Sequence, residues 1–338
     1  MRRISVFLLA VTLCGAETAD TPEPGFVSWL AAFHARAAAA GVSESTLGRE
    51  LAGLRYNPRV VELDHAQPDR TSAVRPDFGT YLASHLNAAR IVRGQRKAAA
   101  LGPTIARIEA RYGVPGPVLV AIWGMETDYG ASAGRFDLVR SLATLAYEGR
   151  RRDLFERELI AALGLIDKRD VTRAALVGSW AGATGQPQFL PSSYARLAVD
   201  GDGDGRADIW GNDADTLASI ANYLKLNGWR AGARWGMPVV VPPLLERWRV
   251  RATGVAPACP RPLAEHSRWL TIAQWRALGL ADAGGRGWPA GATLATLIEP
   301  DGPGRKAYLT FGGYRALLAY NCSNFYALSV GLLSERLR

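Results

Sequence analysis

The chain has 338 residues, of which 48% are hydrophobic and 21% charged, as in ordinary globular proteins. This length allows two or three domains with a sizeable core. The net charge of +9 favours polyanionic partners such as nucleic acid, membrane surfaces or acidic cell-wall polymers. No arginine-rich run or basic–aromatic stripe indicates nucleic acid, so we expect no nucleic-acid partner.

The first 16 residues have the pattern of a secretory signal peptide. Arg2 and Arg3 are followed by an apolar run at 4–13 and by small residues at 14–16, where cleavage is expected. The apolar run is too short to span a membrane. Acylation of Cys14, which would anchor the chain to a membrane, is the alternative. Leu13 fits acylation poorly because a small residue is expected before the acylated cysteine, so cleavage and release are favoured.

Helical patterns fill most of the next 200 residues. Apolar residues recur at helical spacing over 25–100, and Ser43 has the position of an N-cap. Pro115 and Pro117 fit the first turn of a helix that runs to about Thr127 and stops near Gly130. Further helices are predicted at 151–167 and 213–227, the latter after a stretch of loops.

From Pro238 the pattern changes to short β-like runs between glycines and prolines, and helix returns at the end of the chain. The predicted fold is α+β and mainly α. We expect an N-terminal helical domain at 20–105, a helical core at 106–235, a small β-rich unit at 236–312, and a C-terminal helix at 313–338 that returns to the core.

Two cysteines remain after removal of the signal segment, Cys259 and Cys322. They can pair in an oxidising compartment. The sequence does not show whether their Cα atoms lie within disulfide reach, so a disulfide and two free thiols both stay open.

Glu126 ends an otherwise apolar helical run. On a helix over 115–127 it shares one face with Leu119 and Ile122. Burial disfavours the charged form, so we expect a raised pKa, which suits a general acid. On a continued helix Asp128 would lie about 200° around from Glu126, and the two carboxylates would not converge. The alternative is a structural glutamate that caps a helix or pairs with an arginine.

Residues 178–194 form a loop rich in glycine, glutamine and serine. Small residues let a ligand approach the backbone, and the amide and hydroxyl groups suit sugar hydroxyls and acetamido groups. Trp180 and Phe189 offer aromatic faces for stacking on a sugar ring. An ordinary glycine-rich loop is the alternative.

Residues 200–215 resemble the start of an EF-hand loop. Asp200, Asp202 and Asp204 stand at positions one, three and five, and Gly205 stands at six. Position twelve is a glycine, so a later carboxylate, Asp213 or Asp215, has to close the site. We expect a structural Ca²⁺, and the alternative is a solvated acidic turn.

Together these stretches resemble the lytic murein transglycosylases of the MltB type. The resemblance covers nearly the whole mature chain, and the glutamate block followed by the Gly-Gln block makes it specific. It implies a lysozyme-like helical core with an N-terminal helical domain and a small β domain. It rests on residues 59–68, 111–130, 179–194, 200–210, 215–224 and 320–330.

The resemblance implies cleavage of the β-1,4 bond between N-acetylmuramic acid and N-acetylglucosamine in peptidoglycan. A single carboxyl acts as acid and then as base, and a 1,6-anhydromuramoyl end forms without addition of water. We therefore expect peptidoglycan strands as partner, a periplasmic location, a monomer and no organic cofactor. Two alternatives are less favoured. A lysozyme-type hydrolase would use a second carboxylate, and none is evident in the sequence. A non-catalytic wall-binding protein would gain nothing from a buried Glu126.

The resemblance also assigns roles to single residues. Glu126 matches the catalytic residue. The matching saccharide contacts are Ser179 and Gln188, with Tyr223, Tyr320, Asn321 and Tyr326 lining the groove and Tyr81 as a weaker match. The matching calcium ligands are the side chains of Asp200, Asp202, Asp204 and Asp215 and the carbonyl of Arg206. Thr184, where the family has methionine, and Pro187 before Gln188 are departures that bear on the shape of the sugar subsites.

Overall fold

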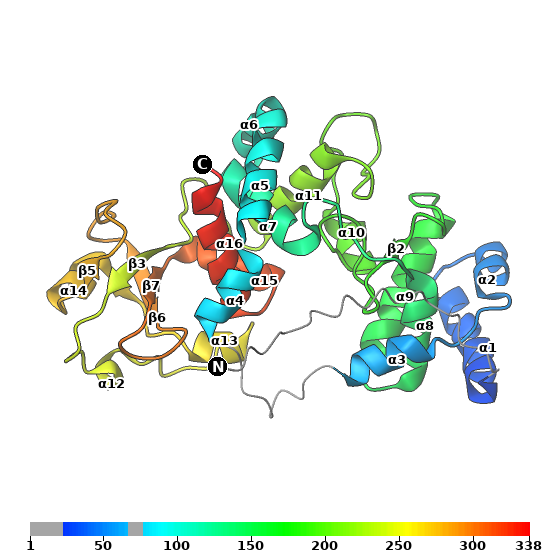
Figure 1. Ribbon diagram of the computed structural model, residues 1–338. Helices are drawn as coiled ribbons and strands as arrows, with labels where there is room; N and C mark the ends of the chain where they lie inside the picture. Colours follow the sequence, from blue (N-terminus) through cyan, green and yellow to red (C-terminus); the bar gives the residue numbers. More distant parts are fainter. Residues whose placement is uncertain (1–22, 67–76) are drawn as a thin grey trace, which may run out of the picture.

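The computed structural model describes residues 23–66 and 77–338 (Figure 1). The predicted signal segment and Cys14 lie outside these residues. The described elements form three groups that lie side by side: a sheet at one end, helices in the centre, and a second set of helices at the other end. Each group has its own hydrophobic core.

The central group is built around helix α7, which is buried on nearly all sides. A helix that is apolar all round is typical of a protein core. Helices α16, α11, α5 and α6 pack against it. The helices that contribute to this core are α4 (Phe78–His85), α5 (Ala88–Ala100), α6 (Gly102–Tyr112), α7 (Gly116–Thr127), α11 (Asp213–Leu226), α15 (Gly312–Tyr320) and α16 (Asn324–Arg336).

The second helical group packs around the antiparallel contact of α8 with α9. A short antiparallel strand pair, β1 (Phe136–Asp137) with β2 (Val177–Gly178), lies beside it. Buried Asp64 forms ion pairs of 2.9 and 2.8 Å with Arg150 and Arg151 and so ties α3 to the turn before α9. The helices of this core are α1 (Pro24–Ala39), α2 (Glu44–Leu51), α3 (Pro58–His65), α8 (Leu138–Glu148), α9 (Arg152–Asp167) and α10 (Pro191–Leu197).

The residues expected to form one N-terminal domain do not share a core. Helices α1 to α3 pack in the second group, whereas α4 to α6 pack against α7 in the central group. The physical reason is that each of these helices buries one apolar stripe, as Phe33 and Val60 show for the first set and Phe78 and Ile105 for the second. Such a stripe requires a partner but does not specify which one.

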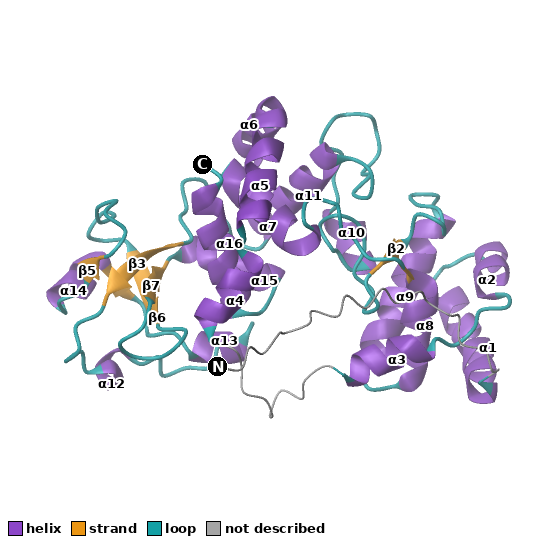
Figure 2. Ribbon diagram, in the orientation of Figure 1, coloured by secondary structure: helices purple, strands orange, loops and turns teal. Residues whose placement is uncertain are grey.

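The first strand of the β-rich unit, β3, begins at Gly236. The strands of the unit form one antiparallel sheet of order β4-β6-β7-β3-β5, and β3, β5, β6 and β7 are seen together at one end of the molecule in Figure 2. Trp275 is fully buried in its core. The unit also has three short helices that the sequence pattern did not indicate. Its elements are β3 (Gly236–Val240), α12 (Arg247–Val250), α13 (Pro260–Ala264), β4 (Leu270–Thr271), α14 (Ile272–Ala277), β5 (Ala281–Asp282), β6 (Leu294–Ile298) and β7 (Ala307–Thr310).

The C-terminal segment returns to the core as two helices, α15 and α16, where one was expected. Cys259 and Cys322 form a disulfide with a Cα–Cα distance of 5.5 Å, which joins the start of α13 to the turn between α15 and α16. Among the described residues no single helix is long and apolar enough to cross a membrane. Only α15 and α16 taken together pass on length and composition, and they are bent by 117°.

Candidate active site

Glu126 lies in the last turn of α7, the buried helix of the central group. The helix ends at Thr127 because Asp128 and Tyr129 adopt left-handed backbone conformations, with φ of 52° and 64°. The ring of Tyr129 folds back onto Gly124, where a Cβ atom would lie only 2.6 Å from it. The site therefore needs a glycine one half-turn before the glutamate.

Asp128 does not face the same point as Glu126. Its carboxylate pairs with Arg93 at 2.5 Å and with Arg90 at 3.5 Å. The expectation that the two carboxylates do not converge is met, but by a different geometry. The helix ends at Thr127, so Asp128 is not on a continued helix at 200° from Glu126. Its left-handed backbone and its two arginine partners set the direction of its side chain instead.

The carboxyl of Glu126 is held by a tyrosine from the far end of the chain. Tyr326 on α16 donates its phenolic O–H to Glu126 Oε1 at 2.5 Å. Burial raises the pKa of Glu126 to about 7, and the hydrogen bond from Tyr326 partly offsets this rise. Glu126 forms no ion pair with any lysine or arginine of residues 23–66 and 77–338, which removes the alternative of a structural ion-pair glutamate.

The charge of Glu126 shifts the pKa of three tyrosines. Burial first, and then the carboxylate, raise the pKa of Tyr81, Tyr320 and Tyr326, so these phenols stay protonated and act as neutral donors. Tyr320 donates to the carbonyl oxygen of Pro187 at 2.7 Å. The ring of Tyr223 packs against that of Tyr320 at a tilt of 53°, with ring centroids 4.7 Å apart. The structure thus gathers tyrosines from α4, α15 and α16 near the glutamate, and Tyr223 of α11 adjoins this group through Tyr320.

Asn321 is the member of the predicted set that lies farthest out. It is exposed in the turn after α15, where its backbone N–H donates to the carbonyl of Leu317 at 3.2 Å. It adjoins Cys322, so the disulfide holds the turn that presents it.

The Gly-Gln loop is closely hydrogen-bonded. Ser179 Oγ accepts from the N–H of Ala183 at 3.0 Å. Gln188 has a left-handed backbone, with φ of 53°, and its Nε2 donates to the carbonyls of Gly185 and Ala133 at 2.9 and 3.1 Å. Both side chains are partly exposed. The amide hydrogens of Gln188 are therefore already used, and its amide oxygen is the atom left for a ligand.

Thr184, the departure from the family pattern, is fully buried and hydrogen-bonded. Its Oγ1 donates to the carbonyl of Val177 at 2.7 Å and accepts from Trp210 Nε1 at 2.8 Å. The hydroxyl therefore connects the Gly-Gln loop to the aspartate loop, which a methionine would not do. Pro187 places its carbonyl where Tyr320 reaches it.

Gln186 is a site residue that the sequence reasoning missed. Its buried side chain accepts from Trp123 Nε1 at 2.8 Å, and its carbonyl accepts from Thr127 Oγ1 at 2.8 Å. Trp123 and Thr127 flank Glu126 on α7, so this contact fixes the end of the helix against the loop. The sequence offers one signal for such a contact, because the tryptophan of a buried helix needs an acceptor for its N–H.

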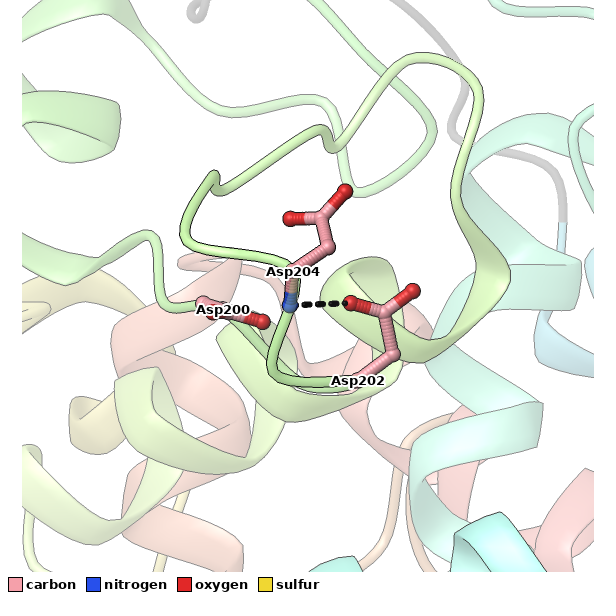
Figure 3. A group of neighbouring side chains, drawn as sticks. All are labelled: Asp200, Asp202 and Asp204. Carbon is pink, nitrogen blue, oxygen red and sulfur yellow. Dashed lines mark hydrogen bonds between the residues drawn. The ribbon is translucent and has the colours of Figure 1, made fainter.

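The aspartate loop brings three carboxylates together (Figure 3). One carboxylate oxygen from each of Asp200, Asp202 and Asp204 lies within 4.8 Å of the others. The loop is shaped by backbone donors: Asp202 Oδ1, for example, accepts from the N–H of Asp204 at 3.1 Å. Hydrogen bonds from the N–H groups of Gly203 and Gly205 lower the pKa of Asp200.

Asp215, the predicted closing ligand, lies fully buried beneath this loop. Its two oxygens accept from the N–H groups of Gly201 and Asp208 at 2.8 and 2.6 Å. Burial, and then the charges of Asp202 and Asp200, raise its pKa. The N–H of Arg206 donates to Asp204 at 2.8 Å. Clustered carboxylate oxygens that repel one another fit a hard divalent cation such as Ca²⁺.

The fold and the site define a class: a mainly helical protein with a small antiparallel sheet and one buried carboxyl group, of raised pKa, next to tyrosines. Residues 25–335 match the family described as the Transglycosylase SLT domain, and the chain belongs to this family. It is 33% identical over 225 residues to the membrane-bound lytic murein transglycosylase B of Escherichia coli (strain K12). That alignment covers 66% of this chain and 57% of the relative, so the chain spans less than two thirds of the relative's length.

Solved structures agree with this assignment. SltB3 from Pseudomonas aeruginosa, in complex with NAG-anhNAM-pentapeptide, is 38% identical with a TM-score of 0.82, over 92% of this chain and 79% of that one. The Escherichia coli lytic transglycosylase Slt35, in complex with calcium, is 25% identical with a TM-score of 0.72, over 93% and 92%. The predicted family and the lysozyme-like, mainly helical fold are confirmed.

Proposed function

We propose that the protein is a lytic transglycosylase that cleaves the β-1,4 bond between N-acetylmuramic acid and N-acetylglucosamine in peptidoglycan. The observation that carries this proposal is Glu126, whose pKa of about 7 keeps a large fraction of the carboxyl protonated near neutral pH. Among residues 23–66 and 77–338 no second carboxylate contributes to that pKa. A site with one acid and no separate base suits an intramolecular displacement better than attack by water.

The reaction uses the same carboxyl twice. Glu126 gives its proton to the glycosidic oxygen as the C1–O bond breaks. The carboxylate then takes the proton of the muramoyl 6-hydroxyl as O6 bonds to C1, which closes the 1,6-anhydro ring and restores the acid. The acetamido group of the same sugar assists at C1. The Tyr326 hydrogen bond stabilises the carboxylate formed between the two steps.

The glycan strand contacts the side chains gathered around Glu126. Tyr320 and Tyr223 present adjoining rings, and the partly exposed Ser179 and Gln188 supply polar atoms from the loop. The full proposed set is Tyr81, Ser179, Gln188, Tyr223, Tyr320, Asn321 and Tyr326. We further propose that the enzyme is a monomer and acts in the periplasm, where its substrate lies. Cleavage of the signal segment, in preference to anchoring through Cys14, would release it there.

The product identifies the reaction. We expect digestion of purified sacculi to release muropeptides with 1,6-anhydromuramic ends, because no second carboxylate in the described part of the chain acts on Glu126 as a base for water would. Mass spectrometry distinguishes these from reducing muramic ends by the mass of one water. A hen-type lysozyme digest of the same sacculi serves as the control for reducing ends. Predominantly reducing ends from this protein would establish the hydrolase alternative.

Calcium is proposed as a structural ion of the aspartate loop, held by Asp200, Asp202, Asp204, the Arg206 carbonyl and Asp215. When bound, it offsets the repulsion among the carboxylates and cross-links the loop. One solved relative is a calcium complex.

We expect Ca²⁺ to raise the melting temperature, since an ion that binds only the folded state stabilises it by about 2.7 kcal/mol at a hundred times its Kd. Asp204→Ala should reduce this shift, whereas Asp153→Ala, which removes an exposed carboxylate of α9, should not. Thermal melts in chelator and in millimolar Ca²⁺ measure the difference. Identical melting curves for the parent protein in the two conditions would refute a bound calcium ion.

A further inference from the structure

Arg315 on α15 is a largely buried cation. Its Nη2 donates to Thr296 Oγ1 at 3.2 Å, and its guanidinium lies 4.9 Å from the ring centroid of Trp269. Its Nη1 is buried and has no hydrogen-bond partner. Within the described parts of the chain no carboxylate forms an ion pair with it. The guanidinium is therefore only partly satisfied by the protein, although it lines a cavity.

The surroundings do not neutralise this charge. Burial lowers the pKa of Arg315 to about 10, and the small opposing effect comes from Tyr314. His266, which lies beside it, is uncharged near neutral pH because burial, and then the charge of Arg315, lower its pKa to about 4. A buried charge is stable only when it is paired, so the site favours an anion.

A cavity of about 310 Å³ opens at this position. Its walls are the 252–256 loop, His266, Arg268, Trp269 and Arg315, and none of its lining residues is acidic. Trp269 is 41% exposed. A cation next to an exposed aromatic ring fits a carboxylate that is carried on an organic chain, since the guanidinium attracts the carboxylate and the ring contacts the chain.

We propose that this cavity binds a free carboxylate of the peptide stems of peptidoglycan, with Arg315 as the residue that holds it. The proposal rests on the proposed function, which makes peptide-bearing glycan the substrate. Helix α15 carries Arg315 in its first half and Tyr320, near Glu126, at its end. The disulfide between Cys259 and Cys322 fixes the chain that follows the 252–256 loop to the turn after α15.

The test compares two ligands in a Glu126→Gln background, which prevents cleavage. One is a peptide-bearing glycan strand, and the other is the same strand after an amidase has removed its peptides. We expect Arg315→Met to weaken binding of the peptide-bearing strand about tenfold, as for loss of a charge-assisted hydrogen bond, and to leave the stripped strand unaffected. Arg276→Met removes an exposed arginine of the same β-rich unit and should change neither affinity. Unchanged binding in a folded Arg315→Met protein, or equal weakening for both strands, would overturn the proposal.

A second variant covers the case in which Arg315→Met does not fold. A Cβ atom at Gly254 meets no heavy atom within 4 Å, so Gly254→Asp places a competing carboxylate in the cavity wall without a clash. It should weaken only the peptide-bearing strand, and no effect would contradict the site.

Two small probes identify the source of the carboxylate. N-acetyl-D-alanyl-D-alanine should shift the Trp269 indole resonance at concentrations where acetate does not, and equal shifts by acetate would overturn the peptide assignment. With Glu126 intact, absence of anhydro products from both strands would instead refute the proposed function, independently of these affinities.

Discussion

Glu126→Gln is expected to abolish cleavage of glycan strands while the protein stays folded and still binds peptidoglycan. Glutamine has nearly the same shape and can accept the hydrogen bond from Tyr326, but it has no proton to give. General acid–base catalysis is typically worth about 10²–10⁴-fold in rate. Because one group serves both proton transfers here, the loss should reach the upper end of this range or exceed it. Sacculus-clearing assays and a binding assay on the same preparation measure the two properties.

Asp128→Asn is the matched control for this variant. It removes a carboxylate two residues away that pairs with Arg90 and Arg93 and does not face Glu126. Asparagine tolerates the left-handed backbone at this position, so the fold should persist and the chemical step should continue. A folded Glu126→Gln protein that clears sacculi at the parent rate, or an Asp128→Asn protein that alone loses the reaction, would show that the catalytic carboxyl is misassigned.

The local elements of the fold could be predicted because their determinants lie close together in the sequence. Ser43 caps α2 through its side chain, as its position indicated, and α7 begins behind Pro115. The division of the first six helices between two cores could not be predicted. The apolar faces of Phe33 and Phe78 look alike in sequence. Phe33 joins the core of α8 and α9, whereas Phe78 contacts Tyr308 and Phe325 near the end of the chain.

The central residue of the site could also be found from its own helix, because a glutamate on an apolar stripe is visible in the spacing. Its partner could not, since Tyr326 is 200 residues away and no local pattern joins the two. Family resemblance supplied Tyr326. Gln186 was missed because its contacts with Trp123 and Thr127 exist only after the loop folds onto α7. The roles of the surrounding side chains stay predictions until they are tested by substitution.

The pKa of Glu126 also predicts how stability depends on pH. The folded protein raises this pKa from 4.5 to about 7, so it favours the protonated form. Protonation therefore stabilises the folded state below pH 4.5, and this contribution is lost as the pH rises from 4.5 through 7. A shift of this size corresponds to about 3 kcal/mol. Above pH 7 Glu126 should lower the free energy of unfolding by an amount of that order.

Glu126→Gln does not titrate, so it isolates this contribution. Its free energy of unfolding should match that of the parent at pH 4, exceed it increasingly between pH 4.5 and 7, and exceed it by a constant amount above pH 7. Urea denaturation of both proteins at a series of pH values measures the difference. A difference that stays flat from pH 4 to pH 9 would mean that the pKa of Glu126 is not shifted.

Tyr326→Phe tests the same pKa from the other side. The Tyr326 hydrogen bond lowers the pKa of Glu126, so its loss should raise that pKa further and move the pH-dependent range upward. Cleavage requires the protonated acid, so the rate of the parent enzyme should fall above about pH 7, and the fall should begin at higher pH in Tyr326→Phe. The variant should also be slower at its optimum, because the carboxylate formed between the two proton transfers loses its donor. A slower enzyme with an unmoved pH profile would show that Tyr326 contacts substrate without setting the acidity of Glu126.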